Sequence, residues 1–162
     1  ALSQSAACLI INNLESAIKY PGRLKYREAL SRGSLMAGMA FSQTKTTACH
    51  AISYPLTAYY KIPHGLACAL SLPKVFEFNR LKIKDKAKQI ASWFKCDSTE
   101  QGNQKISSFI ESLNLPVSLR KMNIKINNIE DVFYSSLNSQ QIQNNPKRIS
   151  KTDLLRIIYS LQ

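Results

Sequence analysis

Apolar residues recur along most of the chain at the three- and four-residue spacing that is typical of amphipathic helices. The first stripe covers residues 2–18, and a Pro-Gly pair at 21–22 ends it. A second stripe covers residues 24–41 and contains Gly33 and Gly38, where we expect neighbouring helices to pack closely. The polar residues that follow predict an interruption before the next helix.

Prolines divide the middle of the chain. A short helix is predicted over residues 49–54 and is expected to end before Pro55, because proline has no backbone N–H and disfavours helix in the preceding residue. A new apolar segment starts after the Pro-His-Gly sequence at 63–65, and Pro73 inside it predicts a kink or a break. The chain is therefore expected to turn back on itself between residues 54 and 64.

The remainder of the chain predicts shorter amphipathic helices. Ser150, with Asp153 three residues later, resembles an N-terminal capping pair. Strand alternation, an internal repeat and a glycine-rich phosphate loop are not found in the sequence. The predicted fold class is all-α, with about seven or eight helical elements in one domain. The helices predicted in this part cover residues 84–94, 103–113, 129–137 and 154–161.

Length and composition agree with one globular domain. The chain has 162 residues and 44% apolar content, which is enough to bury a core without disulfide or metal staples. No stretch approaches the run of about 20 apolar residues that spans a bilayer, so we expect a soluble protein with no membrane partner. The cysteines form no C-x-x-C pair, and reduced thiols in a cytoplasmic protein are expected. They are Cys8, Cys49, Cys68 and Cys96.

Charge raises the question of an anionic partner. Lys and Arg outnumber Asp and Glu by 22 to 10, which gives a net charge of +12. The basic residues are spread over segments 79–88, 118–127 and 145–151, and aromatic residues of the kind that stack bases are few in them. A solvated basic surface is expected, and nucleic acid is not the expected partner. A basic helical module that binds nucleic acid or another anionic partner remains the alternative.

The two histidines of the chain, His50 and His64, lie fourteen residues apart. One straight helix would separate them by about 21 Å, too far to share an ion. Pro55 and Pro63 argue against that helix, and a chain that folds back could bring His64, at the start of the next helix, against His50. Tyr54 lies four residues after His50, so both side chains could line one cleft.

Two imidazoles suit iron, zinc, nickel or copper, but a catalytic centre usually has three protein ligands. No acidic residue stands at a helical spacing from either His50 or His64. From the residues alone, two unrelated structural histidines therefore remain an open interpretation.

A long ordered pattern covers residues 36–73, MAGMAFSQTKTTACHAISYPLTAYYKIPHGLACALSLP. It contains Ala-Phe-Ser, a histidine nine residues after that phenylalanine, Pro-Leu five and six residues after the histidine, then Pro-His-Gly and an aliphatic run ending in Leu-Pro. This pattern resembles the signature region of the iron-containing alcohol dehydrogenases, which share a fold with dehydroquinate synthase. The similarity continues through LNLPVSL, IEDVFYSSL and NNPKRISKTDLLRII, and so covers essentially the whole chain.

The resemblance implies that residues 1–162 are the C-terminal helical, metal-binding domain of such an enzyme. His50 and His64 match the two later histidine ligands of the family's metal, and the earlier Asp and His ligands would belong to a helix before Ala1. The N-terminal nucleotide-binding domain is likewise expected outside this chain, as a missing half, and assembly as a homodimer is left open. Phe41 falls where the family places an aromatic beside the nicotinamide and substrate, with a plain core phenylalanine as the alternative.

Tyr54 departs from the resemblance. Many family members carry there a second histidine that helps to relay a proton, and a phenol does this poorly unless its surroundings tune it. The wording HAISYPLT is closest to the branch with phosphonoacetaldehyde and other small-aldehyde reductases.

The implied activity is hydride transfer from NAD(P)H to a small aldehyde polarised by Fe²⁺ or Zn²⁺. With two of four expected ligands, this chain alone is expected to have neither activity nor tight metal binding.

Overall fold

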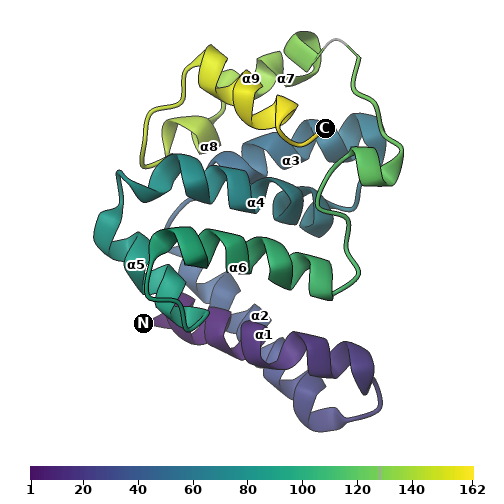
Figure 1. Cartoon of the computed structure of the whole chain (residues 1–162), viewed down its shortest axis with the longest axis vertical. Helices are drawn as coiled ribbons and strands as arrows, with labels where there is room; N and C mark the ends of the chain where they lie inside the picture. Colours follow the sequence, from purple (N-terminus) through teal and green to yellow (C-terminus); the bar gives the residue numbers. More distant parts are fainter. Residues whose placement is uncertain (128) are drawn as a thin grey trace.

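The computed structural model describes residues 1–127 and 129–162, and helices dominate this part of the chain (Figure 1). No β-strand occurs among the described residues, which confirms the predicted all-α fold class. None of the described helices combines the length and the apolar character that crossing a bilayer requires. The helices are α1 (Leu2–Lys19), α2 (Leu24–Ser42), α3 (Ala48–Tyr60), α4 (His64–Arg80), α5 (Lys84–Trp93), α6 (Thr99–Ser112), the 3₁₀ helix η1 (Arg120–Met122), α7 (Ile129–Leu137), α8 (Gln140–Gln143) and α9 (Lys151–Tyr159).

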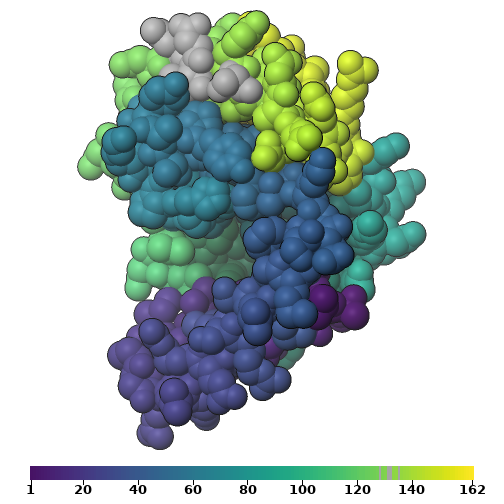
Figure 2. Space-filling model, turned by 180° about the vertical axis from the view of Figure 1, so that it is seen from behind, coloured from purple at the N-terminus to yellow at the C-terminus, as the bar shows by residue number. Residues whose placement is uncertain are grey.

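The spatial order of the helices differs from their order in the sequence. α1 and α2 pack against each other at one end, α5 and α6 lie next, and α3 and α4 follow, with α7, α8 and α9 at the other end (Figure 1). The space-filling view from behind shows the α1–α2 hairpin projecting from the body of the molecule (Figure 2). The pair α3 and α4, which carries both histidines, is therefore held between other helices.

Two clusters of buried side chains hold this arrangement together. The larger cluster joins α3, α7 and α9 through residues such as Ile52, Phe133 and Ile158, each at most 1% exposed. The smaller cluster joins α4 to α6 through Phe76 and Ile106. Full burial of one such side chain contributes about 1.5–3 kcal/mol. The core thus anchors α3 only two residues beyond His50.

The predicted end of a helix before Pro55 is wrong, because α3 continues through Pro55 to Tyr60. A proline in a helix leaves the carbonyl four residues earlier without its usual donor, and here that carbonyl belongs to Ala51. The buried hydroxyl of Ser136, from α7, donates to the Ala51 carbonyl oxygen at 3.0 Å. A partner from another helix therefore replaces the lost hydrogen bond.

Two other helices differ from their predicted boundaries, and one predicted cap agrees with the structure. The predicted break at Pro73 is wrong, because α4 continues through this residue. α6 begins at Thr99 rather than at residue 103, because the Ser98 side chain caps it by accepting the backbone N–H of Gln101. The capping pair of Ser150 with Asp153 is confirmed as a full capping box.

The two glycines of α2 differ in their surroundings. A Cβ on Gly33 would lie 3.0 Å from Cγ1 of Ile10 and 3.3 Å from the carbonyl oxygen of Ala6, both on α1. A Cβ on Gly38 would meet no atom within 4 Å. The expected close packing is confirmed at Gly33 and is wrong at Gly38.

Gly102 marks a tighter helix contact, and it yields a stability prediction. A Cβ there would lie 2.6 Å from Cβ of Ala91 on α5. We expect Gly102→Ala to lower the free energy of unfolding by about 1–3 kcal/mol through overpacking. Gly38→Ala is the matched control and should raise it by up to about 1 kcal/mol through helix propensity. Denaturant unfolding measures both, and a Gly102→Ala protein as stable as the original would contradict the close packing of α5 and α6.

Candidate metal centre

The connection between α3 and α4 places both histidines. His50 lies in the first turn of α3, and His64 is the first residue of α4. Lys61 ends α3 in the left-handed backbone conformation, with a φ of 57°, and its N–H donates back to carbonyl oxygens of the last turn. The chain thus folds back after Tyr60 rather than after Tyr54, and it still returns His64 to His50.

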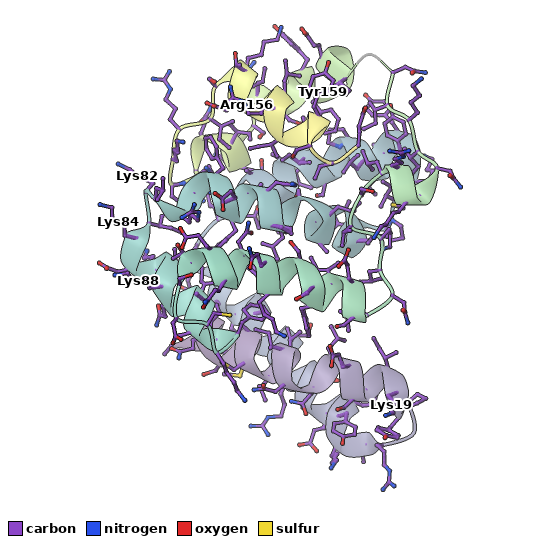
Figure 3. The ribbon with its side chains drawn as sticks, viewed as in Figure 1. Lys19, Lys82, Lys84, Lys88, Arg156 and Tyr159 are labelled. Atoms are coloured by element: carbon purple, nitrogen blue, oxygen red, sulfur yellow. The ribbon has the colours of Figure 1, made fainter. Side chains whose placement is uncertain are left out.

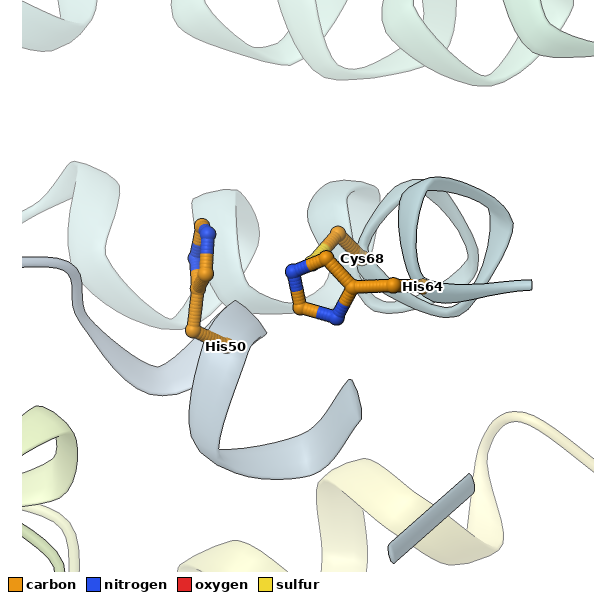
Figure 4. Close-up of side chains that lie close together, drawn as sticks. All are labelled: His50, His64 and Cys68. Atoms are coloured by element: carbon orange, nitrogen blue, oxygen red, sulfur yellow. The ribbon is translucent and has the colours of Figure 1, made fainter. Parts of the chain in front are cut away.

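The two imidazole rings approach each other edge to face. Their centroids are 5.3 Å apart and their planes meet at 63° (Figure 4). The predicted convergence of His50 and His64 is therefore confirmed as geometry. Burial, and secondly the charge of His64, lower the pKa of His50 from its usual value. This shift favours the neutral imidazole, which is the form that binds a metal ion.

Ser53 determines which nitrogen of His64 carries the proton. The Ser53 hydroxyl donates to the backbone carbonyl of His50 at 2.8 Å, and its oxygen lies 3.2 Å from Nδ1 of His64. A hydroxyl has one hydrogen, so when that hydrogen is donated to the His50 carbonyl, Ser53 accepts at His64 and the tautomer with the proton on Nδ1 is favoured. The Nε2 lone pair of His64 is therefore available, and a hydrogen bond of this kind orients a histidine ligand.

Cys68 is a third donor that the sequence analysis missed. The possible ligand atoms of His50, His64 and Cys68 all lie within 4.8 Å of one another. The signal was present, because Cys68 follows His64 by one helical turn, but only acidic residues were considered at that spacing. Burial is the main cause that raises the pKa of the Cys68 thiol. Two imidazoles and a thiol form a donor set that fits a divalent transition metal.

Cys49 is next to His50 in sequence but has a different environment. Burial raises the pKa of its thiol to about 12. Cys49 is also absent from the group of possible ligand atoms found among the described residues. We therefore interpret Cys49 as a packed thiol and not as a ligand or a nucleophile.

The histidines open onto a pocket of about 430 Å³. Phe41, at the end of α2, is 58% exposed beside this pocket, so its interpretation as a plain core phenylalanine is wrong. No carboxylate is among the lining residues, and Lys45 supplies a positive charge. The full lining consists of Phe41, Lys45, Thr46, His50, Tyr54, His64, Gln140 and Gln141.

Tyr54 lies in the same pocket as His50, as its spacing in the sequence predicted. Its ring stacks on His64, with centroids 6.0 Å apart and planes 11° from parallel. The Gln141 side-chain amide donates to the Tyr54 hydroxyl oxygen at 3.4 Å. Because the amide is the donor, the phenol hydrogen remains available for an acceptor in the pocket.

Among the residues that line this pocket, Lys45 is the one with a basic side chain, and other basic side chains lie on several separate elements. Lys82, Lys84 and Lys88 project together near the α4–α5 turn, whereas Lys19 lies at the far end of the hairpin and Arg156 on α9 (Figure 3). This dispersion agrees with a solvated basic surface.

Comparison with known proteins gives the family. Residues 1–161 match the model described as "Fe-containing alcohol dehydrogenase family, C-terminal". The 1,3-propanediol dehydrogenase of Citrobacter freundii is 27% identical over 165 residues, which cover 97% of this chain and 43% of that protein. A crystal structure of 1,3-propanediol oxidoreductase is similar with a TM-score of 0.93 at 26% identity, covering 100% of this chain and 44% of the other.

A second solved structure is the sulfoacetaldehyde reductase of Bifidobacterium kashiwanohense in complex with NAD⁺. It is 28% identical, with a TM-score of 0.88, over 98% of this chain and 42% of the other. The chain thus spans less than half the length of these relatives. Because the family match covers nearly every residue and the fold agrees throughout, this chain belongs to the Fe-containing alcohol dehydrogenase family and corresponds to its C-terminal helical part.

Proposed function

We propose that this chain is the metal-binding part of an NAD(P)-linked alcohol dehydrogenase that reduces small aldehydes. The observation that supports it best is that His50 and His64 meet at one open pocket in a chain of this family. In this proposal residues 1–162 form the helical catalytic domain. A nucleotide-binding half, for which the greater length of the relatives leaves room, holds the cofactor.

His50 and His64 are the proposed metal ligands, and the ion is Fe²⁺ or Zn²⁺. When bound, the ion supplies a Lewis acid for the aldehyde oxygen, and the nicotinamide supplies the hydride. The chain's own contribution is positional. Ser53 holds the His64 ring with Nε2 unprotonated, and the core beside Ile52 fixes the start of α3.

Tyr54 and Phe41 are the other proposed site residues. Tyr54 directs its hydroxyl hydrogen to the substrate oxygen while Gln141 holds the phenol oxygen. As the alcohol forms, the Tyr54 hydroxyl donates its proton there, and solvent at its half-exposed edge restores it. Phe41 places an apolar ring at the pocket, where it would lie beside a bound nicotinamide and substrate and exclude water.

The pocket also supports a substrate class, a small anionic aldehyde such as phosphonoacetaldehyde. Lys45 lines the pocket and no carboxylate does. The net charge of +12 adds a favourable field for an anion. One similar structure belongs to a protein named for an aldehyde with a sulfonate group.

An assay of NAD(P)H oxidation, with the chain joined to its nucleotide-binding half, tests the proposal. Phosphonoacetaldehyde should be reduced, a chelator should abolish turnover, and Fe²⁺ or Zn²⁺ should restore it. Residues 1–162 alone should give no turnover, because the cofactor has no binding domain there. A favourable charge pair is worth about 1 kcal/mol or more, so kcat/KM should exceed that for uncharged propanal by about tenfold.

One variant serves as a control for this assay. Lys45→Met should remove the preference for phosphonoacetaldehyde and leave the turnover of propanal unchanged. A protein that turns over no aldehyde with any metal, and binds nucleic acid with an affinity that falls steeply with salt, would contradict the proposal. That result would favour the basic helical module instead.

A further inference from the structure

Three soft or borderline donors meet where α3 and α4 begin. Cys68 Sγ lies 3.8 Å from Nε2 of His64, and the donors of His50, His64 and Cys68 fall within 4.8 Å of one another. The close-up shows the two imidazole rings projecting toward each other, with Cys68 beside the ring of His64 (Figure 4). We propose that the Cys68 thiolate is a third metal ligand, so that this chain by itself supplies a His₂Cys site for a thiophilic divalent ion such as Zn²⁺.

The donor spacing agrees with coordination. In a tetrahedral zinc site with Zn–S of about 2.3 Å and Zn–N of about 2.0–2.1 Å, a sulfur and a nitrogen ligand lie about 3.6 Å apart. The 3.8 Å between Cys68 and His64 needs almost no movement to reach that value. His50 has to approach by a small shift, and as a partly exposed side chain at the start of α3 it has room to do so.

The positions of the protons on His64 and Cys68 also favour these two residues as ligands. Ser53 places the proton of His64 on Nδ1, so the nitrogen nearest Cys68 is Nε2, which carries a lone pair. In this tautomer and without metal, the Cys68 S–H would donate to that lone pair across the 3.8 Å between Sγ and Nε2. On metal binding, the thiol proton leaves to the buffer, and Sγ and Nε2 both coordinate. No redox change is involved.

The ordinary interpretation of this contact is a weak thiol–imidazole hydrogen bond between packed side chains. Two features of the site are not explained by such a hydrogen bond. A second imidazole, His50, lies within reach of both groups, and both imidazoles line an open pocket by which an ion and a substrate could enter. These three donors all come from residues 1–162, before any ligand from outside this chain is counted.

A thiolate ligand would determine which metal ion binds best at this site. Thiolate favours zinc over magnesium, calcium or manganese, and among divalent ions zinc also exceeds iron in general affinity. The weak binding expected from two histidines alone is therefore replaced by tight binding. This inference rests on the proposed function only for the role of the two histidines.

Cobalt spectroscopy of the protein carrying this chain tests the inference without measuring activity. Co²⁺ should give intense visible ligand-field bands and a near-ultraviolet sulfur-to-cobalt charge-transfer band. Cys68→Ser should abolish the charge-transfer band and weaken Zn²⁺ binding by about tenfold or more. Cys49→Ser and Cys96→Ser are matched controls that should keep the band.

The outcomes separate the two proposals. Ligand-field bands without a charge-transfer band in the original protein would overturn the role of Cys68 and leave the histidine ligands standing. A charge-transfer band that survives in Cys68→Ser would also overturn it. No cobalt bands at all would contradict the histidine site as well. If Cys68→Ser fails to fold, X-ray absorption of the zinc-loaded original protein decides, since the inference requires a sulfur at about 2.3 Å.

Discussion

Replacement of His64 by alanine is expected to lower kcat/KM for aldehyde reduction by at least about a thousandfold, because a bound Lewis acid supplies several kcal/mol of transition-state stabilisation. His50→Ala should act in the same way, since it also removes one ligand of the ion. The expected accompanying change is loss of bound metal. Initial rates, together with metal content measured by mass spectrometry, check both parts.

The control is Tyr159, an exposed aromatic residue on α9 (Figure 3). Tyr159→Ala should retain both the rate and the metal. Full metal content in both histidine variants, with or without activity, would show that the ion is bound elsewhere.

Ser53→Ala is expected to weaken metal binding by about 10–100-fold, although Ser53 is not itself a ligand. The substitution removes the acceptor for Nδ1 of His64 and leaves the ring free to rotate or to change tautomer. Competition with a chromophoric chelator measures the affinity.

Ser71 offers a matched comparison for Ser53. Both serines are fully buried, and each hydroxyl donates to the carbonyl three residues earlier, that of His50 for Ser53 and that of Cys68 for Ser71. Of the two, only Ser53 has a hydrogen bond to His64 among the described residues. Ser71→Ala should therefore share any general loss of stability and keep the metal affinity. An equal loss of affinity in the two variants would mean that Ser53 acts through packing alone.

Most helices could be predicted from the sequence because their apolar stripes and caps are local signals. The capping box at Ser150 is an example, since both partners lie within three residues. Pro55 is the opposite case. Local rules end the helix there, and the hydroxyl that compensates comes from Ser136, 85 residues further along the chain than Ala51. No local pattern contains that partner.

Some residues of the candidate site could likewise be predicted from local sequence patterns, and others could not. His50 and Tyr54 could be predicted to share a cleft from their spacing of four residues. The return of His64 to His50 was predicted from Pro55 and Pro63, but α3 continues through Pro55 and the chain reverses at Lys61. Cys68 could have been added from its helical spacing after His64. Gln141 could not be predicted. It lies in α8, a single short turn that no apolar stripe predicts, and the Gln141 side chain reaches Tyr54 only through the tertiary fold.

The central claim is that His50 and His64 hold one metal ion. Anomalous diffraction at the zinc or iron absorption edge, from crystals of the metal-loaded protein, locates the ion directly. We expect one strong peak about 2 Å from a ring nitrogen of each histidine. A metal-loaded crystal with no peak between these rings, or with its only peak at another site, would show that His50 and His64 do not hold the ion.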